Sequence, residues 1–174
     1  MRTKISIVYG DIASLKVDAI VNAANKKFTE SLGAQGGIFK MAGEELFKAC
    51  LRLGECKIGE AKITSGYNLP AKYVIHTVSP AYGAMDGMEA SFLEDCYKNC
   101  LSLADKHNLE TLAFPNISAG SYGFPIQESA PIALESILEY LQENPETKLK
   151  ELILLVTSEV DYKIYKEIWR DYLN

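Results

Sequence analysis

The chain has 174 residues, a length that suits one domain and allows a substantial buried core. Its net charge of -5 argues against general nucleic-acid binding, because such binding depends on Lys and Arg neutralising phosphates. No apolar run reaches the roughly 18 residues of a membrane span, and the N-terminus has no signal-peptide pattern. We therefore expect a single domain over residues 1–174, with no nucleic-acid partner and no membrane contact.

Strand and helix patterns alternate along the first half of the chain. An alternating strand is expected to end at the Gly10-Asp11 turn, and the apolar run at residues 19–21 is typical of a strand buried on both faces. Residues from about 36 to 53 follow a helical period, which predicts one helix. Two further strands, at residues 61–67 and 73–78, are separated by an Asn-x-Pro sequence that favours a hairpin turn.

The same alternation continues in the middle of the chain. Residues 88–106 predict a helix, and residues 112–114 predict a short buried strand. The next helix is expected over residues 128–142, with Ser129 and Pro131 supplying the chemistry of a helix start.

The chain ends in a strand and a helix. The strand is expected at residues 152–156, and the helix at residues 162–172 carries an inward aromatic stripe. The stripe comprises Tyr165, Ile168, Trp169 and Tyr172. The whole pattern predicts an α/β fold, a three-layer α/β/α sandwich around a central mixed, mostly parallel sheet.

Ligands of such folds bind beyond the carboxyl ends of the strands. The loop at residues 118–123 follows a predicted strand, precedes a predicted helix and is rich in small residues. Its backbone N–H groups and the helix dipole favour an anion, above all phosphate. The residues are Ser118, Ala119, Gly120, Ser121, Tyr122 and Gly123.

Polar residues also follow the first two predicted strands. Asp11 is either a turn or cap residue or a carboxylate that accepts a hydrogen bond from an exocyclic amine. Asn22 and Asn25 either end their strand for conformational reasons or hold sugar hydroxyls or a water. Further on, small residues would let a sugar or phosphate approach the backbone. They are Gly33, Gly36 and Gly37.

The four cysteines are too few for a disulfide scaffold. Cys96 and Cys100 share a face of a predicted helix but have no His in the same element, so buried reduced thiols are expected rather than a metal site. This composition favours a cytoplasmic protein, and we expect no cofactor.

Together these motifs resemble the macrodomain family, which binds ADP-ribose. Residues 8–12 (VYGDI) are similar to the family's first-strand motif, residues 17–25 (VDAIVNAAN) to its second strand, and residues 117–125 to its diphosphate loop. Residues 59–78 resemble the branch that hydrolyses O-acetyl-ADP-ribose and mono-ADP-ribosylated proteins.

The resemblance implies a role for each part of the site. Asp11 would hold the adenine amine with Ile12 beside the base, and residues 118–123 would wrap the diphosphate. Asn25 would hydrogen-bond the distal ribose, against which Tyr122 would pack. The expected partners are ADP-ribose or an ADP-ribose ester and mono-ADP-ribosylated proteins.

One position departs from the hydrolytic branch. Most of that branch's glycine run is missing, and Gln35 occupies the position of its acid. An amide cannot act as a general base at neutral pH, and a positioned base contributes about 10²–10⁴-fold to the rate. Two classes therefore stay open: a hydrolase in which the substrate's own phosphate orients or activates the water, which is our preferred hypothesis, and a non-catalytic ADP-ribose reader.

Overall fold

A central sheet organises the computed structural model, which describes residues 3–25, 34–120 and 122–173. Within these residues the sheet has six strands in the order β1-β6-β5-β2-β4-β3. All neighbouring strands run parallel except β3 and β4, which are antiparallel, so the predicted hairpin and the mixed sheet are confirmed. The strands are β1 (Lys4–Tyr9), β2 (Ala19–Ala24), β3 (Ala61–Ser65), β4 (Tyr73–Val78), β5 (Thr111–Pro115) and β6 (Glu151–Val156).

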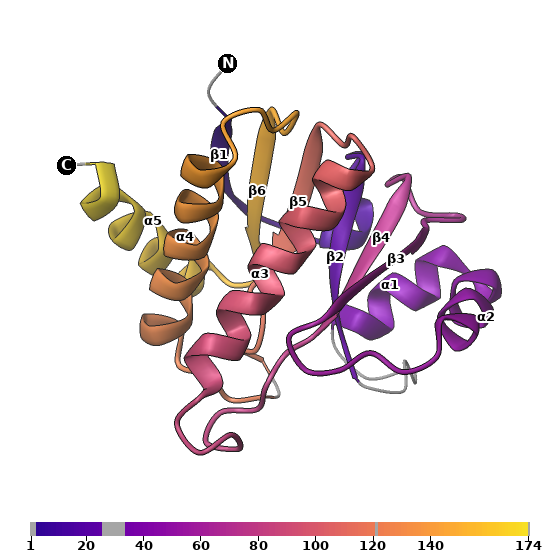
Figure 1. The fold of residues 1–174 in the computed structure, drawn as a ribbon, viewed down its shortest axis with the longest axis horizontal. Coiled ribbons are helices and arrows are strands. Elements are labelled where there is room, and N and C mark those ends of the chain that lie inside the picture. Colours follow the sequence, from indigo (N-terminus) through magenta and orange to yellow (C-terminus); the bar gives the residue numbers. More distant parts are fainter. Residues whose placement is uncertain (1–2, 26–33, 121, 174) are drawn as a thin grey trace.

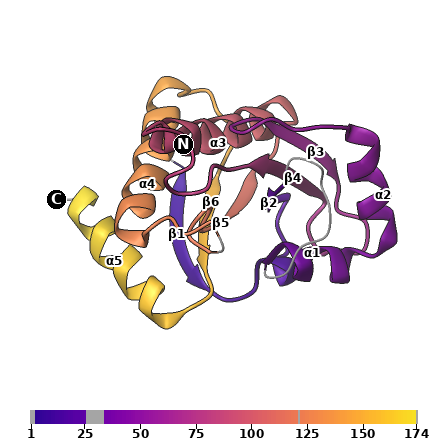
Figure 2. The same ribbon diagram turned by 90° about the horizontal axis from the view of Figure 1, so that it is seen from below.

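Helices cover both faces of the sheet and complete the predicted three-layer sandwich (Figures 1 and 2). Helices α1 and α2 lie on one face and α3 and α4 on the other, while α5 packs beside α4 and β1. None of the helices in the described part of the chain is long and apolar enough to cross a membrane. The helices are η1 (Ile12–Ser14), α1 (Ala34–Ala42), α2 (Glu44–Leu53), α3 (Glu89–Lys106), α4 (Ile126–Glu143) and α5 (Glu159–Leu173).

Two apolar clusters, one on each face of the sheet, hold the layers together. Strand β2 feeds both, because Val21 faces the α3–α4 layer and Ile20 faces the α1–α2 layer, and both are fully buried. On the α3 side, the buried rings of Tyr97 and Phe114 lie 5.0 Å apart between centroids. Burial of a large apolar side chain contributes roughly 1.5–3 kcal/mol, so these clusters fix the strand ends that position the site.

The single helix expected over residues 36–53 is wrong: it is two helices that meet at Gly43. Gly43 has a φ of +86°, and a Cβ there would lie 2.9 Å from the side-chain nitrogen of Asn68. The N–H of Asn68 donates to the carbonyl of Ala42, which caps the end of α1. The apolar period runs through this break, so the periodicity hides the change in direction.

The expected start of the fourth long helix is also corrected. Helix α4 begins at Ile126 after Pro125, so Ser129 and Pro131 lie inside it rather than at its start. Pro125 has an extended backbone (φ -60°, ψ 134°) that leads directly into the first turn. The Ser129 hydroxyl instead donates to the side-chain oxygen of Asn116, at 3.4 Å.

The aromatic stripe of the last helix is only partly inward. Tyr165 is buried, and Ile168 and Trp169 are half-buried against the core. Tyr172 was expected inside but is 37% exposed, and its hydroxyl donates to Glu135 at 2.6 Å. The phenol is therefore placed by its hydrogen bond at the helix surface, where α5 runs beside α4.

Candidate ligand-binding site

A crevice opens where the parallel strands end. In Figure 1, β2 and β6 point toward the lower edge of the sheet, and their carboxyl ends lie along it. A cavity of about 340 Å³ lies at this edge and contains residues that follow β1, β5 and β6. Its lining residues are Asp11, Ile12, Pro115, Asn116, Ala119, Gly120, Leu155, Thr157 and Asp161. Convergence of the β1 turn and the small-residue loop was expected from their places after strands.

Asp11 has the cap role that the sequence left open, and it also lines the crevice. Its Oδ1 accepts a hydrogen bond from the N–H of Ala13 at 3.1 Å, which starts helix η1. Asp11 is exposed, whereas Ile12 beside it is buried and only 3% exposed. One oxygen therefore fixes the turn, and the exposed residue also lines the cavity. The two interpretations of Asp11 are compatible.

The loop after β5 holds a left-handed conformation at two residues. Ser118 has a φ of +65° and Gly123 a φ of +71°. The Gly123 N–H donates to Gly120 at 3.0 Å, and the Phe124 N–H donates to the Ser118 carbonyl at 2.9 Å. The Ser118 hydroxyl donates to the Pro80 carbonyl at 3.0 Å and is buried. Since Ser118 lacks the freedom of glycine, these bonds must stabilise its strained backbone.

This conformation leaves backbone donors available. Within the described residues, the N–H groups of Ser118, Gly120 and Tyr122 make no backbone hydrogen bond. The N-terminus of α4 follows three residues after Gly123 and adds the positive end of a helix dipole. No Lys or Arg occurs from residue 107 to residue 147. The local geometry can therefore bind an anion through the backbone without a cationic side chain.

Asn116 is a supporting residue that the sequence analysis missed. Its side-chain oxygen accepts hydrogen bonds from Tyr165 at 3.1 Å and from Ser129 at 3.4 Å. It thus ties the end of β5 to α5 and α4 at the base of the loop. Thr157 and Asp161 were also missed, although Thr157 directly follows β6. Their position after a strand was the one available signal.

Asn22 lies inside the sheet layer rather than on the crevice lining. It is 1% exposed, and its amide Nδ2 donates to His76 Nδ1 at 3.0 Å. His76 Nε2 lies 2.9 Å from the hydroxyl of Thr64. Burial lowers the pKa of His76 to about 3, so the ring is neutral at neutral pH. Because Nδ1 accepts from Asn22, the ring proton is on Nε2. Asn22 has a structural role in this network, and its contact with a ligand stays a prediction.

The two residues assigned to the distal sugar follow neighbouring strands, Asn25 directly after β2 and Tyr122 in the loop after β5. Asn25 directly follows β2 and is half-buried. Tyr122 is half-buried, and its carbonyl accepts a hydrogen bond from the N–H of Tyr82 at 2.9 Å. Gln35, Gly36 and Gly37 belong to the first turn of α1. Gly33, Ser121 and the side chain of Gln35 lie outside the part of the chain that the structure describes. The roles of all these residues stay predictions.

The cysteines are buried, unpaired thiols, as expected. Burial raises the pKa of Cys50 to about 12 and that of Cys96 to about 11, so both are protonated at neutral pH. Cys96 lies 3.4 Å from the carbonyl of Val78 in the core. Among the described residues, no group of three His, Cys, Asp or Glu could hold a metal ion.

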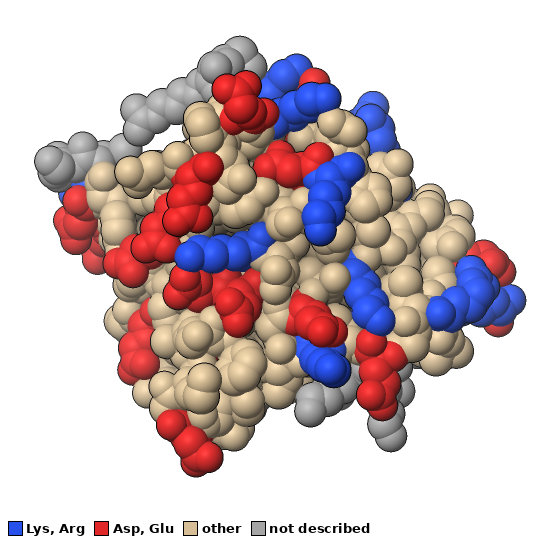
Figure 3. Space-filling view, in the orientation of Figure 1, with Lys and Arg blue, Asp and Glu red and all other residues tan. Residues whose placement is uncertain are grey.

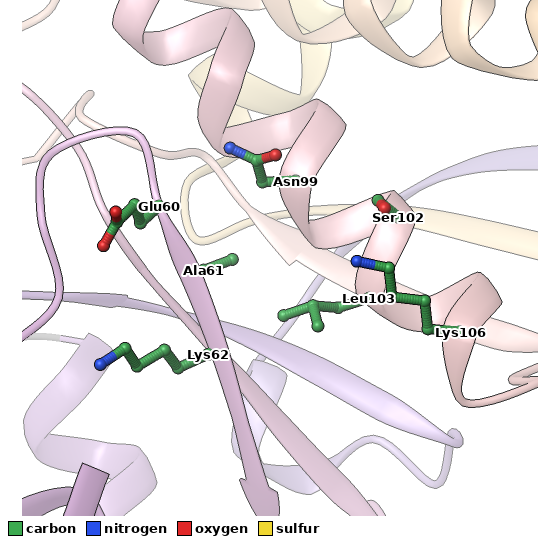
Figure 4. Close-up of a pocket in the computed structure, with 7 residues that line it drawn as sticks. All are labelled: Glu60, Ala61, Lys62, Asn99, Ser102, Leu103 and Lys106. Carbon is green, nitrogen blue, oxygen red and sulfur yellow. The ribbon is translucent and has the colours of Figure 1, made fainter.

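A second cavity, of about 350 Å³, lies between the edge strand β3 and the second half of α3 (Figure 4). Lys62 is held at its rim, because its Nζ donates to the carbonyls of Leu53 and Glu55 at the end of α2. Asn99 donates to the carbonyl of Gly59. This lateral cavity is lined by Glu60, Ala61, Lys62, Asn99, Ser102, Leu103 and Lys106. None of the predicted ligand residues is among them.

Comparison with known proteins matches this architecture to one family. The macro domain family model matches residues 21–133. ADP-ribose glycohydrolase MACROD2 of Homo sapiens is 46% identical over 172 residues, covering 98% of this chain. ADP-ribose glycohydrolase MACROD1 of Mus musculus is 45% identical over 168 residues, covering 96% of this chain. The chain spans only 40% and 52% of the lengths of these two relatives.

Solved structures agree with the family match. The Oceanobacillus iheyensis macrodomain with ADP superposes with a TM-score of 0.93 at 39% identity, covering 98% of this chain and 92% of that one. The Trypanosoma brucei macrodomain in complex with ADP-ribose gives a TM-score of 0.88 at 36% identity, covering 95% and 68%. The chain belongs to the macro domain family.

Proposed function

We propose that the crevice binds ADP-ribose. The carrying observation is that the left-handed loop with free backbone donors opens on the same cavity as Asp11 and Ile12. In this arrangement Asp11 accepts from the adenine amine, Ile12 contacts the base, and residues 118–123 surround the diphosphate. Asn25 and Tyr122 hold the distal ribose. The ADP and ADP-ribose complexes of the structural relatives support this choice of ligand.

The proposed reaction is hydrolysis of an ADP-ribose ester. Water adds across the ester, so one fragment gains OH and the other gains H, and the products are ADP-ribose and a free carboxylic acid. The glycohydrolase names of the MACROD1 and MACROD2 relatives support a hydrolase over a reader. Gln35 cannot remove a proton from the water, so the diphosphate of the substrate is proposed to orient or activate it.

The finer assignments are proposals as well. O-acetyl-ADP-ribose and ADP-ribose on protein Asp or Glu side chains both fit this chemistry, since each is a carboxylate ester of the sugar. The four unpaired thiols support a cytoplasmic setting, in which cysteines stay reduced. A reader function remains the second candidate, and Gln35 is the residue that favours it.

Binding is tested first. ADP-ribose should bind with a micromolar or lower dissociation constant, which corresponds to about -8 kcal/mol or better. Isothermal titration calorimetry measures this directly. An absence of heat and saturation at millimolar ADP-ribose would contradict the proposed site.

Turnover is tested with Gln35→Asp. If the missing acid limits the reaction, this variant should hydrolyse an ADP-ribose ester faster than wild type, by less than the full ~10²–10⁴-fold of a positioned base. ADP-ribose affinity should stay nearly unchanged, because a base acts on water in the transition state. Asn25→Ala should lower activity in both backgrounds, since Asn25 orients the sugar. Release of ADP-ribose from an aspartate- or glutamate-modified protein provides the assay.

The outcomes separate the candidate mechanisms. Wild type that turns over readily and is not improved by Gln35→Asp supports activation by the substrate phosphate. If neither protein hydrolyses any ester while both bind ADP-ribose, the reader function is correct.

A further inference from the structure

The loop between β4 and α3, residues 79–88, borders the part of the site assigned to the distal ribose. It begins where β4 ends, and β4 lies next to β2, which Asn25 directly follows. The loop then returns to the diphosphate loop, where the Tyr82 N–H donates to the Tyr122 carbonyl. The ring of Tyr82 packs edge-on against Phe124 with centroids 5.0 Å apart. Figure 1 shows this loop below the first turns of α3, beside the segment that connects β5 to α4.

This rim loop has a preformed shape. The carboxylate of Glu89, which is 8% exposed, accepts a hydrogen bond from the Met85 N–H at 2.9 Å. Hydrogen bonds from Met85 and other backbone N–H groups hold the pKa of Glu89 below its usual value. Gly83, Asp86 and Gly87 all have positive φ, which gives the loop two tight turns. A loop ordered in advance loses little conformational entropy when it contacts a partner.

Apolar side chains stand exposed on this ordered loop. Tyr82 is 48% exposed and Met88 is 55% exposed. Tyr82 also donates from its hydroxyl to Glu128 at 3.0 Å, which fixes the ring at the rim of the site. Exposed aromatic and Met side chains are enriched in protein contact regions.

Among the described residues, the loop and the chain segments that adjoin it carry acidic but no basic side chains. No Lys or Arg occurs from residue 73 to 97 or from 107 to 147, which includes this loop, the diphosphate loop and the start of α4. Asp86 on the loop and Glu128 on α4 are both exposed. In Figure 3, the lower left of the surface, over the position of this loop in Figure 1, shows acidic side chains and no basic ones. The rim therefore complements a positively charged segment.

We propose that residues 79–88 form a docking surface for the protein segment that carries the ADP-ribose, and that this segment bears Lys or Arg beside the modified side chain. The inference rests on the proposed function. The carrier leaves the site at the distal ribose, so its backbone passes over the loop that contacts Tyr122. Exposed Tyr82 and Met88 contact its apolar parts, while Asp86 and Glu128 attract its cations. A free small ester makes none of these contacts.

Calorimetry with stable ADP-ribosyl peptides tests this surface. Two peptides carry ADP-ribose through a linkage that resists hydrolysis, one flanked by Lys and Arg and one by Asp and Glu, with free ADP-ribose as reference. Wild type should bind the basic peptide about 5- to 10-fold more tightly than the acidic one. Asp86→Asn should reduce this preference about two- to fivefold, and Met88→Ser should weaken both peptides about fivefold. Neither variant should change the affinity for free ADP-ribose.

Both variants suit their backbones, and each has a matched control. Asn tolerates the positive φ of Asp86, and Ser is a good N-cap residue at Met88, which precedes α3. The first control is Glu143→Gln, because Glu143 is exposed at the end of α4, roughly 25 Å from its start. The second is Leu51→Ser on α2, because Leu51 is 54% exposed. Neither control should alter peptide binding.

The result that overturns the proposal is equal binding of the two peptides by wild type, or an equal loss in the controls and the rim variants. Tight binding of free ADP-ribose in that experiment would leave the proposed function intact. If free ADP-ribose itself does not bind, the proposed function fails and the docking surface fails with it.

Discussion

Two cavities of nearly equal volume lie on different sides of this molecule, and only one of them has Lys among its described lining residues. The crevice at the strand ends has a volume of about 340 Å³, and its described lining residues include Asp11 and Asp161 but no Lys or Arg. The lateral cavity between β3 and α3 has a volume of about 350 Å³ and includes Lys62 and Lys106. If phosphate binding required cationic side chains, the lateral cavity would be the expected phosphate site.

The backbone geometry instead favours the crevice as the anion site. At the crevice, Ala119 and Gly120 of a partly left-handed loop line the cavity, the Gly120 N–H makes no backbone hydrogen bond, and a helix begins just beyond the loop. In the lateral cavity, Lys62 is used to cap the end of α2 through the carbonyls of Leu53 and Glu55. The comparison shows that an anion site can depend on oriented backbone dipoles rather than on charge count. Four predictions test it.

The largest effect is expected at Asp11. Asp11→Ala should reduce ADP-ribose affinity by about 10- to 150-fold, equivalent to roughly 1.5–3 kcal/mol for a charge-assisted hydrogen bond. Calorimetry with ADP-ribose and its inosine analogue, which lacks the exocyclic amine, should show that the variant has lost the preference for adenine.

Asp11→Asn is the matched control for the cap. Its carbonyl oxygen can still accept from the Ala13 N–H, so stability should stay near that of wild type. Its amide nitrogen would face the adenine amine as a second donor, so affinity should fall about as far as in Asp11→Ala. If wild type binds adenine and inosine ligands equally, Asp11 is a cap residue alone.

The next effect is expected from the loop backbone. Gly123→Val places a β-branched residue at a φ of +71°, where left-handed strain costs roughly 1–2 kcal/mol. Relief of that strain would turn the loop donors away, so affinity should fall about tenfold. Gly54→Val is the control, because Gly54 has a φ of +75° and equally open surroundings but ends α2. It should lower thermal stability similarly without changing affinity; equal loss in both variants would contradict the role of the loop.

Some features of the fold could be predicted from the sequence and others could not. The strand and helix order, the hairpin and the position of the diphosphate loop were all predictable, because each has a local pattern of apolar period or turn residues. The break at Gly43 was not, since Ile38 and Leu46 continue one apolar face across it. The helix start at Ile126 was missed because Ser129 and Pro131 offered a better local signal than Pro125.

Site residues divide in the same way. Asp11 and the loop stand at strand ends that sequence patterns reveal, and the structure brings them to one cavity. Asn116 was missed because its partners, Ser129 and Tyr165, are 13 and 49 residues away along the chain. The bond between Asn22 and His76 spans 54 residues and is likewise invisible without the sheet pairing.

A smaller effect, on stability, is expected from the buried network of Asn22, His76 and Thr64 in the sheet. His76 has a pKa of about 3 in the folded state and about 6.5 when unfolded, so the unfolded state takes up the proton first as pH falls. The stability from neutral His76 is complete above pH 6.5 and is lost progressively toward pH 3. His76→Gln should reduce the slope of unfolding free energy between pH 6 and 5 by up to about 1.4 kcal/mol per pH unit.

Chemical denaturation at several pH values measures that slope. His107→Gln, at the other and exposed histidine, controls for the loss of a histidine. ADP-ribose affinity of wild type should be the same at pH 7.5 and 6, because the crevice does not use a histidine. An unchanged slope in His76→Gln would show that His76 is not neutral in the folded protein.

The smallest effect on ADP-ribose affinity is expected from substitutions in the lateral cavity. Lys106→Glu reverses a charge beside this cavity and should change ADP-ribose affinity less than twofold, because charges beyond about 8–10 Å are largely screened at physiological salt. Lys62→Gln should also leave affinity unchanged, but it should lower stability by about 1 kcal/mol through loss of its bonds to α2. Calorimetry and thermal unfolding separate the two effects. A fivefold or greater loss of affinity in Lys106→Glu would place the diphosphate at the lysines and remove the argument for backbone recognition at residues 118–123.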